Sequence, residues 1–330
     1  MWKQKPLSFS DLGIDGIYTL PSIPRIATTV LPVYNEKDQR IETRSHSVRT
    51  SLFIESILDR GSYGNIYIGK RGDMPVLLKQ PRMAEMNLLQ EAVLQHLAFK
   101  TLEAEGISWA VPKVYDVFLR KTEIWFSMER IRGVSIPEWL SKTTTPDVDI
   151  FFLLAQVCLI LITLESYLNL DHRDLKSNNL LLLKEPCTLR FKLGETSWNL
   201  SCPFKVIVLD FGFACLGSEP LQGIPLVNLG DGVLPPMDPC PKEGRDIFHL
   251  LVSFLGLPIF RERISKELHD KIDGWLSVGK KSYGTMARRW STEHWSYLVS
   301  SQPNFSIPNC CPTRILQDIL PFLKDSLFHA

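Results

Sequence analysis

The chain lacks the cysteine pattern of a secreted or zinc-binding protein. Its seven cysteines are odd in number, scattered, and never spaced as Cys-x-x-Cys. Disulfide-stapled domains and structural zinc sites both depend on such regular spacing. The pattern therefore argues against a disulfide scaffold and a zinc site. It favours a reducing intracellular compartment, either the cytoplasm or the nucleus.

Net charge and long apolar runs are also scarce. The 37 Lys and Arg residues are balanced by 36 Asp and Glu residues, whereas a dedicated nucleic-acid binder carries a basic patch or stripe. The apolar run Phe151–Leu164 is only about 14 residues long and contains Gln156, and a membrane-spanning helix needs about 20 apolar residues. We expect no dedicated nucleic-acid binding, no membrane span, and a buried helix at this run.

The most informative stretch of the chain lies between residues 170 and 212. It begins with DHRDLKSNN (171–179), continues with a run of leucines, and ends with VIVLDFG (206–212). The first half supplies an acid on a loop and an Asn five residues later, and the second half supplies an acid at the end of a β-rich run. In this order the two halves resemble the paired signature of the eukaryotic-type protein kinase superfamily.

The side chains of this stretch suit phosphoryl transfer. Asp210 offers a carboxylate and Asn179 a neutral carbonyl, both hard oxygen ligands of the kind that Mg²⁺ prefers. Asp174 is then free to orient a hydroxyl group and accept its proton. Lys176 can reach the γ-phosphate. The resemblance therefore implies ATP and Mg²⁺ as cofactors, with Asp174 as the catalytic base and Asn179 and Asp210 as the metal ligands.

Upstream, the segment Ile57–Tyr67 resembles the glycine-rich loop of kinases, which lies between two strands. Glycine is useful there because a backbone without a side chain can approach phosphate oxygens closely. Asp59 stands where the family has its first glycine, so the match is partial. By resemblance, the ATP contacts of this loop are Gly61, Ser62, Gly64 and Ile66.

A strand ending in Lys79 and a helix carrying Glu91 are expected next. The run VLLK (76–79) resembles the third kinase strand, whose lysine holds the α- and β-phosphates. The amphipathic segment Met86–Ala104 predicts a helix. On this helix Glu91 resembles the glutamate that pairs with the strand lysine. Glu85 is the alternative partner, but it precedes the helical period and is close to the lysine in the chain.

Two more strands are predicted at Val111–Tyr115 and Ile124–Met128, and the hinge between the lobes is expected near Gly133. Backbone contacts to adenine leave no side-chain signature, so this assignment depends on position alone. By resemblance, the residues beside adenine are Met128, at the gatekeeper position, and the backbone of Glu129 and Ile131.

Between the two halves of the signature the chain departs from ordinary kinases. Residues 184–204 form an insertion, in which Thr188–Leu193 and Trp198–Leu200 flank Gly194-Glu195 like a hairpin. Such an insertion resembles that of haspin-like kinases. Further on, Asp246 resembles the acid that braces the backbone of the catalytic loop, and the rest of the chain reads as short helices.

The resemblance implies an α+β, bilobal, protein-kinase-like fold. We expect a small antiparallel β N-lobe with one main helix at residues 51–133, and a mainly α-helical C-lobe at residues 134–330. Residues 1–50 show no sustained period and are expected to form a loosely ordered or regulatory extension. We expect a monomer that binds ATP between the lobes.

The expected activity is that of a Ser/Thr protein kinase, which transfers the ATP γ-phosphoryl group to hydroxyls of a protein substrate. Lys176 favours this class, because tyrosine kinases resemble one another in lacking a lysine at this position. Two alternatives remain. A catalytically impaired pseudokinase scaffold is favoured by Asp59, by Leu77 in place of the family's usual Ala, and by the missing Ala-Pro-Glu motif. A small-molecule kinase of the aminoglycoside or choline type shares the catalytic Asp and Asn.

We predict that activity does not require phosphorylation of the segment that follows Gly212. Kinases with that requirement pair the phosphate with the arginine of the catalytic loop, here Arg173. Between Phe213 and Arg245 there is no Thr or Tyr, and Ser218 is the only hydroxyl acceptor. Phosphatase-treated wild type and the Ser218→Ala variant should both keep the phosphotransfer rate of untreated protein. A large loss of rate in either would contradict this prediction.

Overall fold

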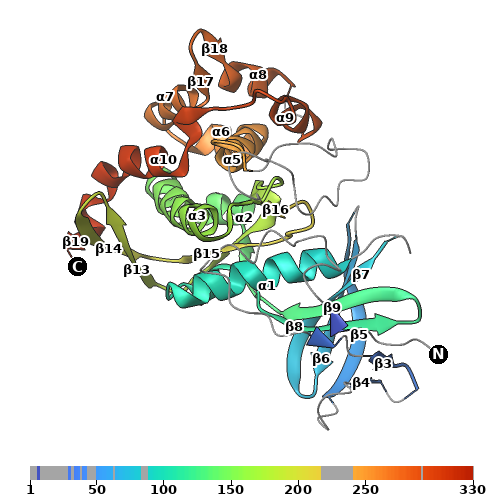
Figure 1. Cartoon of the computed structure of the whole chain (residues 1–330). Coiled ribbons are helices and arrows are strands. Elements are labelled where there is room, and N and C mark those ends of the chain that lie inside the picture. The colour runs from blue at the N-terminus through green and yellow to red at the C-terminus, as the bar shows by residue number, and fades with distance from the viewer. Residues whose placement is uncertain are drawn as a thin grey trace.

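The computed structural model describes residues 6–7, 29–30, 33–37, 39–42, 50–61, 64–82, 88–216, 241–290 and 293–329. Within these residues the fold mixes helices with mainly antiparallel sheets. Figure 1 shows most of the long strands gathered at one end of the molecule and most of the helices at the other. The predicted α+β class is therefore confirmed.

Among the described residues, seven strands close into a barrel. In sheet order they are β3 (Val33–Asn35), β4 (Arg40–Glu42), β5 (Thr50–Arg60), β6 (Gly64–Arg71), β7 (Met74–Pro81), β9 (Glu123–Glu129) and β8 (Val114–Arg120). Neighbouring strands pair antiparallel, except that β3 and β8 pair parallel. A buried cluster that includes Leu52, Val76, Phe118 and Trp125 fills the barrel. Two short strands, β1 (Pro6–Leu7) and β2 (Thr29–Val30), pair with each other.

The barrel includes two strands that the sequence places in an N-terminal extension. β3 and β4 have three residues each, which is too short for an alternating pattern to be recognised.

The predicted strand start at Val111 is wrong, because β8 begins at Val114. Pro112 has no N–H group to donate to a neighbouring strand. Most of residues 1–50 lie outside the described residues.

β7 and α1 (Leu88–Ala104) position the first of the predicted site residues. Side chains alternate between the two faces of a strand, and Val76 and Leu78 of β7 lie in the barrel core. Lys79 therefore faces the other way, where it contacts Glu91 of α1. The described part of α1 ends at the predicted Ala104.

α3 (Pro146–Leu168) is the core helix predicted from the apolar run. It has 23 residues, and every residue from Ile150 to Leu161 is buried. By length and composition it is the one described helix that could cross a bilayer, but 78% of its apolar window is buried inside the protein. Gln156 is also buried; its Nε2 atom donates to Phe204 O at 2.9 Å, and its Oε1 atom accepts from Val206 N at 3.0 Å.

The rest of the chain is mainly helical. The helices are α2 (Ile136–Lys142), α5 (Arg245–Gly256), α6 (Pro258–Arg263), α7 (Lys266–Trp275), α8 (Tyr283–Trp290), α9 (Glu293–Ser300) and α10 (Pro312–Ile319). Short antiparallel pairings join β10 (Val134–Ser135) to β12 (Leu180–Leu183), β12 to β15 (Lys205–Val208), β11 (Leu170–Asp171) to β16 (Cys215–Leu216), and β17 (Ser277–Val278) to β18 (Lys281–Ser282). The β12–β15 pairing brings the two halves of the sequence signature together.

The insertion forms the predicted hairpin. β13 (Cys187–Leu193) pairs with β14 (Thr196–Cys202), and Gly194-Glu195 make the turn between them. Gly194 has φ +62°, a left-handed conformation that glycine adopts without steric cost. The prediction of short helices in the C-terminal part is incomplete, because β17 pairs with β18 and β19 (Leu327–His329) pairs with β14. A strand of three residues carries too short a pattern to be read from the sequence.

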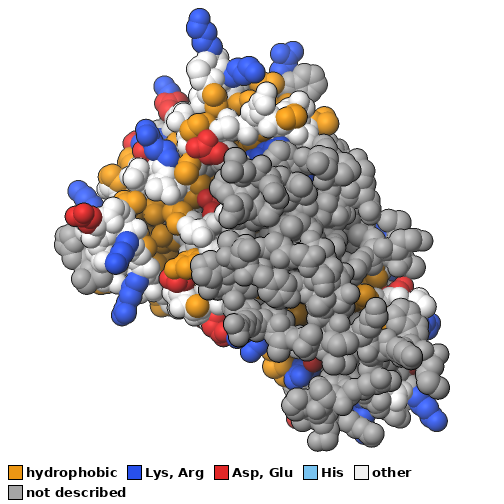
Figure 2. Space-filling model, in the orientation of Figure 1, with side chains coloured by type: hydrophobic (Ala, Val, Ile, Leu, Met, Phe, Trp, Pro, Cys, Tyr) orange, Lys and Arg blue, Asp and Glu red, His pale blue; other side chains and the backbone are white. Residues whose placement is uncertain are grey.

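Cys215 is disulfide-bonded, which the scattered spacing does not predict. The free cysteines among the described residues are Cys158, Cys187, Cys202, Cys310 and Cys311. On the face shown in Figure 2, the Lys and Arg side chains of the described residues project singly and do not merge into a stripe.

Replacing Gln156 with Leu should lower the free energy of unfolding by about 2–6 kcal/mol, because Phe204 O and Val206 N–H each lose a buried partner at a cost of about 1–3 kcal/mol. Urea unfolding followed by tryptophan fluorescence measures the loss. Gln302→Leu changes an exposed side chain and should shift the free energy by less than about 0.5 kcal/mol. Equal stability of Gln156→Leu and wild type would contradict this account.

Candidate active site

Lys79 joins its own strand to the helix that follows it and to a loop that is distant in the chain. Its Nζ atom lies 2.5 Å from Glu91 Oε1 of α1 and 2.9 Å from Asp210 Oδ1, just beyond β15. Lys79 and Glu91 are buried, whereas the Asp210 side chain is 39% exposed. The predicted pairing of Lys79 with Glu91 is confirmed, and Glu85, the alternative, lies outside the described residues. The cluster is closed on the α1 side and open at Asp210.

Burial and charge act in opposite directions on these three groups. Burial by itself would lower the pKa of Lys79, but the charges of Asp210 and Glu91 prevail and raise it. Burial raises the pKa of Glu91 to about 7, against the opposing charge of Lys79. Burial acts to raise the pKa of Asp210 as well, but the charge of Lys79 and its hydrogen bond lower it. At neutral pH the cluster therefore keeps a lysine cation and an Asp210 carboxylate.

Both carboxylate oxygens of Asp174 are engaged. Asn179 Nδ2 donates to Asp174 Oδ2 at 3.1 Å and to its main-chain oxygen at 2.8 Å. Asp174 Oδ1 lies 3.2 Å from Lys176 Nζ and accepts a hydrogen bond from the Tyr297 hydroxyl of α9. Burial raises the pKa of Asp174 to about 6, and the charge of Lys176 opposes the rise. The structure thus brings the predicted Asp174, Lys176 and Asn179 together and adds Tyr297.

Asn179 and Asp210 lie at neighbouring ends of β12 and β15. Leu209 N donates to Asn179 O at 2.9 Å, and the chain then turns at Asp210, whose φ is +62°. Such a value in a residue other than glycine marks a constrained backbone. Because Asn179 Nδ2 bonds to Asp174, its side-chain carbonyl is the end suited to a metal. One carboxylate and one amide carbonyl fit Mg²⁺, which is usually bound by one or two side chains together with phosphate oxygens.

Two buried acids hold the backbone of the loop that carries Asp174. Asp246 accepts hydrogen bonds from the backbone N–H groups of His172 and Arg173, each at 2.7 Å. This contact confirms the bracing role predicted for Asp246. Burial, reinforced by the charge of Asp171, raises the pKa of Asp246 to about 7. Asp171 in turn forms a buried ion pair with Arg245 at 2.5 Å.

The glycine-rich turn lies beside Lys79. Gly61 N donates to Gly64 O at 2.9 Å. A Cβ atom at Gly64 would lie 2.8 Å from a carbonyl oxygen of β7 and 3.1 Å from Lys79 Cε, so a larger residue does not fit. Ile66 is the cross-strand partner of Lys79 and therefore shares its face of the sheet. Ser62, the remaining predicted contact in this turn, lies outside the described residues.

Met128, Glu129 and Ile131 occupy the end of β9 and the segment after it. Met128 pairs with Leu77 of β7 and packs against a buried cluster that includes α1. Glu129 N donates to Lys113 O at 2.8 Å, and Ile131 is half-buried. These contacts put the three residues at the α1 side and edge of the barrel. Their role in binding adenine stays a prediction.

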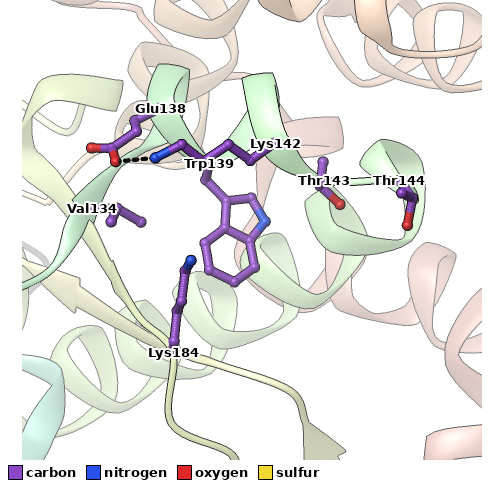
Figure 3. A pocket seen from close by; sticks show the side chains of 7 residues that line it. All are labelled: Val134, Glu138, Trp139, Lys142, Thr143, Thr144 and Lys184. Carbon is purple, nitrogen blue, oxygen red and sulfur yellow. Dashed lines mark hydrogen bonds and ion pairs between the residues drawn. The ribbon is translucent and has the colours of Figure 1, made fainter.

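One cavity lined by described residues lies apart from this cluster. It has a volume of about 220 Å³ and lies between α2 and the residue that follows β12. Figure 3 shows the ring of Trp139 pointing into it, with Lys184 reaching toward that ring and the Glu138–Lys142 ion pair at its side. None of the predicted site residues lines this cavity.

Another cavity, of about 160 Å³, adjoins Asp174. Asp174, Lys176 and Ser177 line one side of it, and His249 and Tyr297 line the other. Burial lowers the pKa of His249 to about 3, with nearby cations adding to the effect. An acceptor hydroxyl could approach Asp174 from this cavity.

Two contacts of the loop that carries Asp174 were not predicted from the sequence, one made by Tyr297 of α9 and one by Arg245 of α5. Tyr297 is 123 residues from Asp174 in the chain, and a tyrosine on a short helix belongs to no motif. Asp171 precedes His172 in the chain and Arg245 precedes Asp246, so both stand next to residues that the sequence singled out. The spacing nevertheless gives no sign that the two side chains meet. The segment 217–240, with Ser218, lies outside the described residues.

Comparisons with known proteins assign no family to the chain. No protein-family model matches it, and no curated protein matches it at a significant level of similarity. The function therefore has to be argued from the side chains and their geometry.

Arg245→Met should lower the free energy of unfolding by about 3–5 kcal/mol, because it leaves the buried Asp171 carboxylate without its partner. Lys142→Met is the matched control, since it breaks an exposed pair with Glu138 and should cost less than about 1 kcal/mol. Urea unfolding measures both. The double variant Asp171→Asn/Arg245→Met should recover part of the loss. A similar small effect of both single variants would show that the buried pair does not hold this loop.

Proposed function

We propose that the protein is a Ser/Thr protein kinase of bilobal fold that transfers the ATP γ-phosphoryl group to protein hydroxyls. In this proposal residues 51–133 form the N-lobe and residues 134–330 the C-lobe, with the short strands β3 and β4 added to the N-lobe sheet. ATP binds between the lobes. The protein acts as a monomer on a protein substrate.

The observation that carries the proposal is the contact of Lys79 with both Glu91 and Asp210. Its Nζ atom lies 2.5 Å from one carboxylate and 2.9 Å from the other. A lysine from a strand, a glutamate from a helix and the acid of an Asp-Phe-Gly motif are the three charged parts that protein kinases need in place around the nucleotide. The contact among these three residues supports the proposal that the nucleotide site is intact.

Each residue of the site then has a chemical role. Lys79 neutralises the α- and β-phosphates, and Glu91 holds the lysine side chain in position. Asn179 and Asp210 would hold Mg²⁺, which supplies charge neutralisation for the phosphates when bound. Asp174 orients the acceptor hydroxyl and takes its proton, because its carboxylate is buried beside the acceptor cavity and its pKa lies at about 6. Lys176 stabilises negative charge on the transferring group.

One observation favours a second candidate, a pseudokinase scaffold. The carboxylate of Asp174 is engaged by Tyr297, Lys176 and Asn179 in this structure, so an acceptor hydroxyl has to displace one of them. Mg²⁺-dependent ATP binding without phosphotransfer would support the scaffold.

Incubation with radiolabelled ATP and either a protein mixture or a metabolite mixture distinguishes a protein kinase from a small-molecule kinase.

Asp174→Asn should reduce phosphotransfer to a protein mixture by about 10² to 10⁴-fold, the usual contribution of a general base. Circular dichroism and urea unfolding should show that the variant folds. Asp270→Asn, an exposed acid on α7, is the matched control and should keep the wild-type rate. Retained activity in Asp174→Asn would contradict the proposed function.

The pH dependence of kcat/KM should follow the ionisation of Asp174. The ionised carboxylate is the active base, so kcat/KM should fall as the pH drops below about 6. Lys176→Met removes a cation 3.2 Å away, which should raise the pKa of Asp174 and move the midpoint upward by about one unit. Lys184→Met, at the separate cavity, should leave the midpoint unchanged. An unchanged or lower midpoint in Lys176→Met would contradict the assignment.

A further inference from the structure

The hydroxyl group of Tyr297 lies where an acceptor hydroxyl has to lie. A general base acts on a proton within hydrogen-bond reach, and Asp174 Oδ1 accepts its hydrogen bond from the Tyr297 hydroxyl. The same oxygen lies 3.2 Å from Lys176 Nζ, and Asp174 Oδ2 accepts from Asn179 at 3.1 Å. The phenol is therefore the hydroxyl that this structure presents to the proposed base.

The packing of α9 on α5 holds Tyr297 in this place. Its ring centre lies 4.9 Å from that of His249 and 6.1 Å from that of Phe213. His249 Nε2 lies 2.9 Å from Ser300 Oγ, and its Nδ1 atom lies 3.2 Å from Ser296 Oγ. Figure 1 shows α9 beside α5. His249 belongs to α5, whereas Phe213 lies in the turn after Asp210. The position of the phenol thus follows from how two helices pack and from one neighbour in that turn.

We propose that the active site of this protein phosphorylates Tyr297 of the same chain. The inference rests on the kinase activity proposed above. Because the fold delivers the phenol to Asp174, no second molecule has to be bound and oriented, and such pre-orientation strongly favours reaction. The preference for Ser and Thr inferred from Lys176 concerns separate substrates, which have to enter the site from solution.

The step is a direct transfer from ATP to the phenol. The Tyr297 oxygen attacks the γ-phosphorus and forms a new O–P bond. The bond from that phosphorus to the β,γ-bridging oxygen breaks, and ADP leaves with the electron pair. The phenolic proton passes to Asp174. Atoms and charge balance with ATP as the only co-reactant.

The product should leave the place where it formed. A phosphotyrosine carries about −1.5 to −2 charges at pH 7, so it is repelled by the Asp174 carboxylate and no longer donates a hydrogen bond to it. Each chain therefore accepts one phosphate at Tyr297. Departure of the side chain uncovers Asp174 beside the cavity of about 160 Å³, from which a separate protein hydroxyl can approach.

The test uses full-length protein that has been treated with phosphatase and repurified. After incubation with Mg²⁺ and ATP, mass spectrometry should find phosphotyrosine at Tyr297, at no more than one phosphate per chain. Its first-order rate constant should not change with protein concentration. Tyr297→Phe and the inactive Asp174→Asn should show no phosphotyrosine there, whereas Tyr283→Phe on α8 should retain the modification at Tyr297. Circular dichroism of each variant checks that it folds.

The outcomes separate this inference from the proposed function. Phosphorylation of casein by wild type without any phosphate on Tyr297 would overturn the inference and leave the kinase assignment standing. A rate constant that rises with protein concentration would overturn modification within one chain. Phosphotyrosine at Tyr297 in Asp174→Asn would show that another enzyme made it. If wild type transferred phosphate neither to casein nor to itself, both proposals would fail.

Discussion

The rest of the site depends on the contacts that the buried Lys79 makes with Glu91 and Asp210. This lysine comes from a barrel strand, and its partners come from a helix and from a loop 131 residues further along the chain. Burying a lysine is costly unless opposite charges compensate. Here two carboxylates do so, and one of them, Asp210, is still partly open to solvent. This arrangement fixes the strand end, the helix and the loop relative to one another.

A second set of buried charges fixes the loop that carries Asp174. Asp246 accepts two backbone hydrogen bonds from it, and the Asp171–Arg245 pair ties its first residue to α5. Backbone N–H groups that were left unpaired in such a buried loop would each cost about 1–3 kcal/mol. The loop can therefore hold Asp174 in one position without a regular secondary structure of its own.

The structure also puts a constraint on access to Asp174. The candidate base is reached from a small cavity between the loop and α5–α9, and the Tyr297 hydroxyl already bonds to it. A site of this kind needs a movement of one side chain before a separate acceptor can bind. Among the described residues, the hydroxyl that bonds to Asp174 comes from α9.

Local patterns in the sequence were sufficient for features that depend on neighbouring residues. The core helix α3 and the hairpin β13–β14 were predicted correctly, because apolar periodicity and a Gly-containing turn are local properties. The contact of Lys79 with Glu91 was expected from the resemblance to kinases, and the structure contains it. The bracing contacts of Asp246 were expected from the same resemblance. The nucleotide and metal roles of these residues stay predictions, since no ligand contact tests them.

Other features could not be predicted, and the physical reason is the same for each. β3, β4 and β19 are too short to show a period, and they form only because longer strands offer free edges to pair with. The Asp171–Arg245 pair and the Tyr297–Asp174 contact join residues more than 70 positions apart. The sequence by itself determined the α+β class, the main helices and the set of chemical groups. Only the packing of α5 and α9 against the loop decided which hydroxyl meets Asp174, because that contact depends on distances that no local pattern encodes.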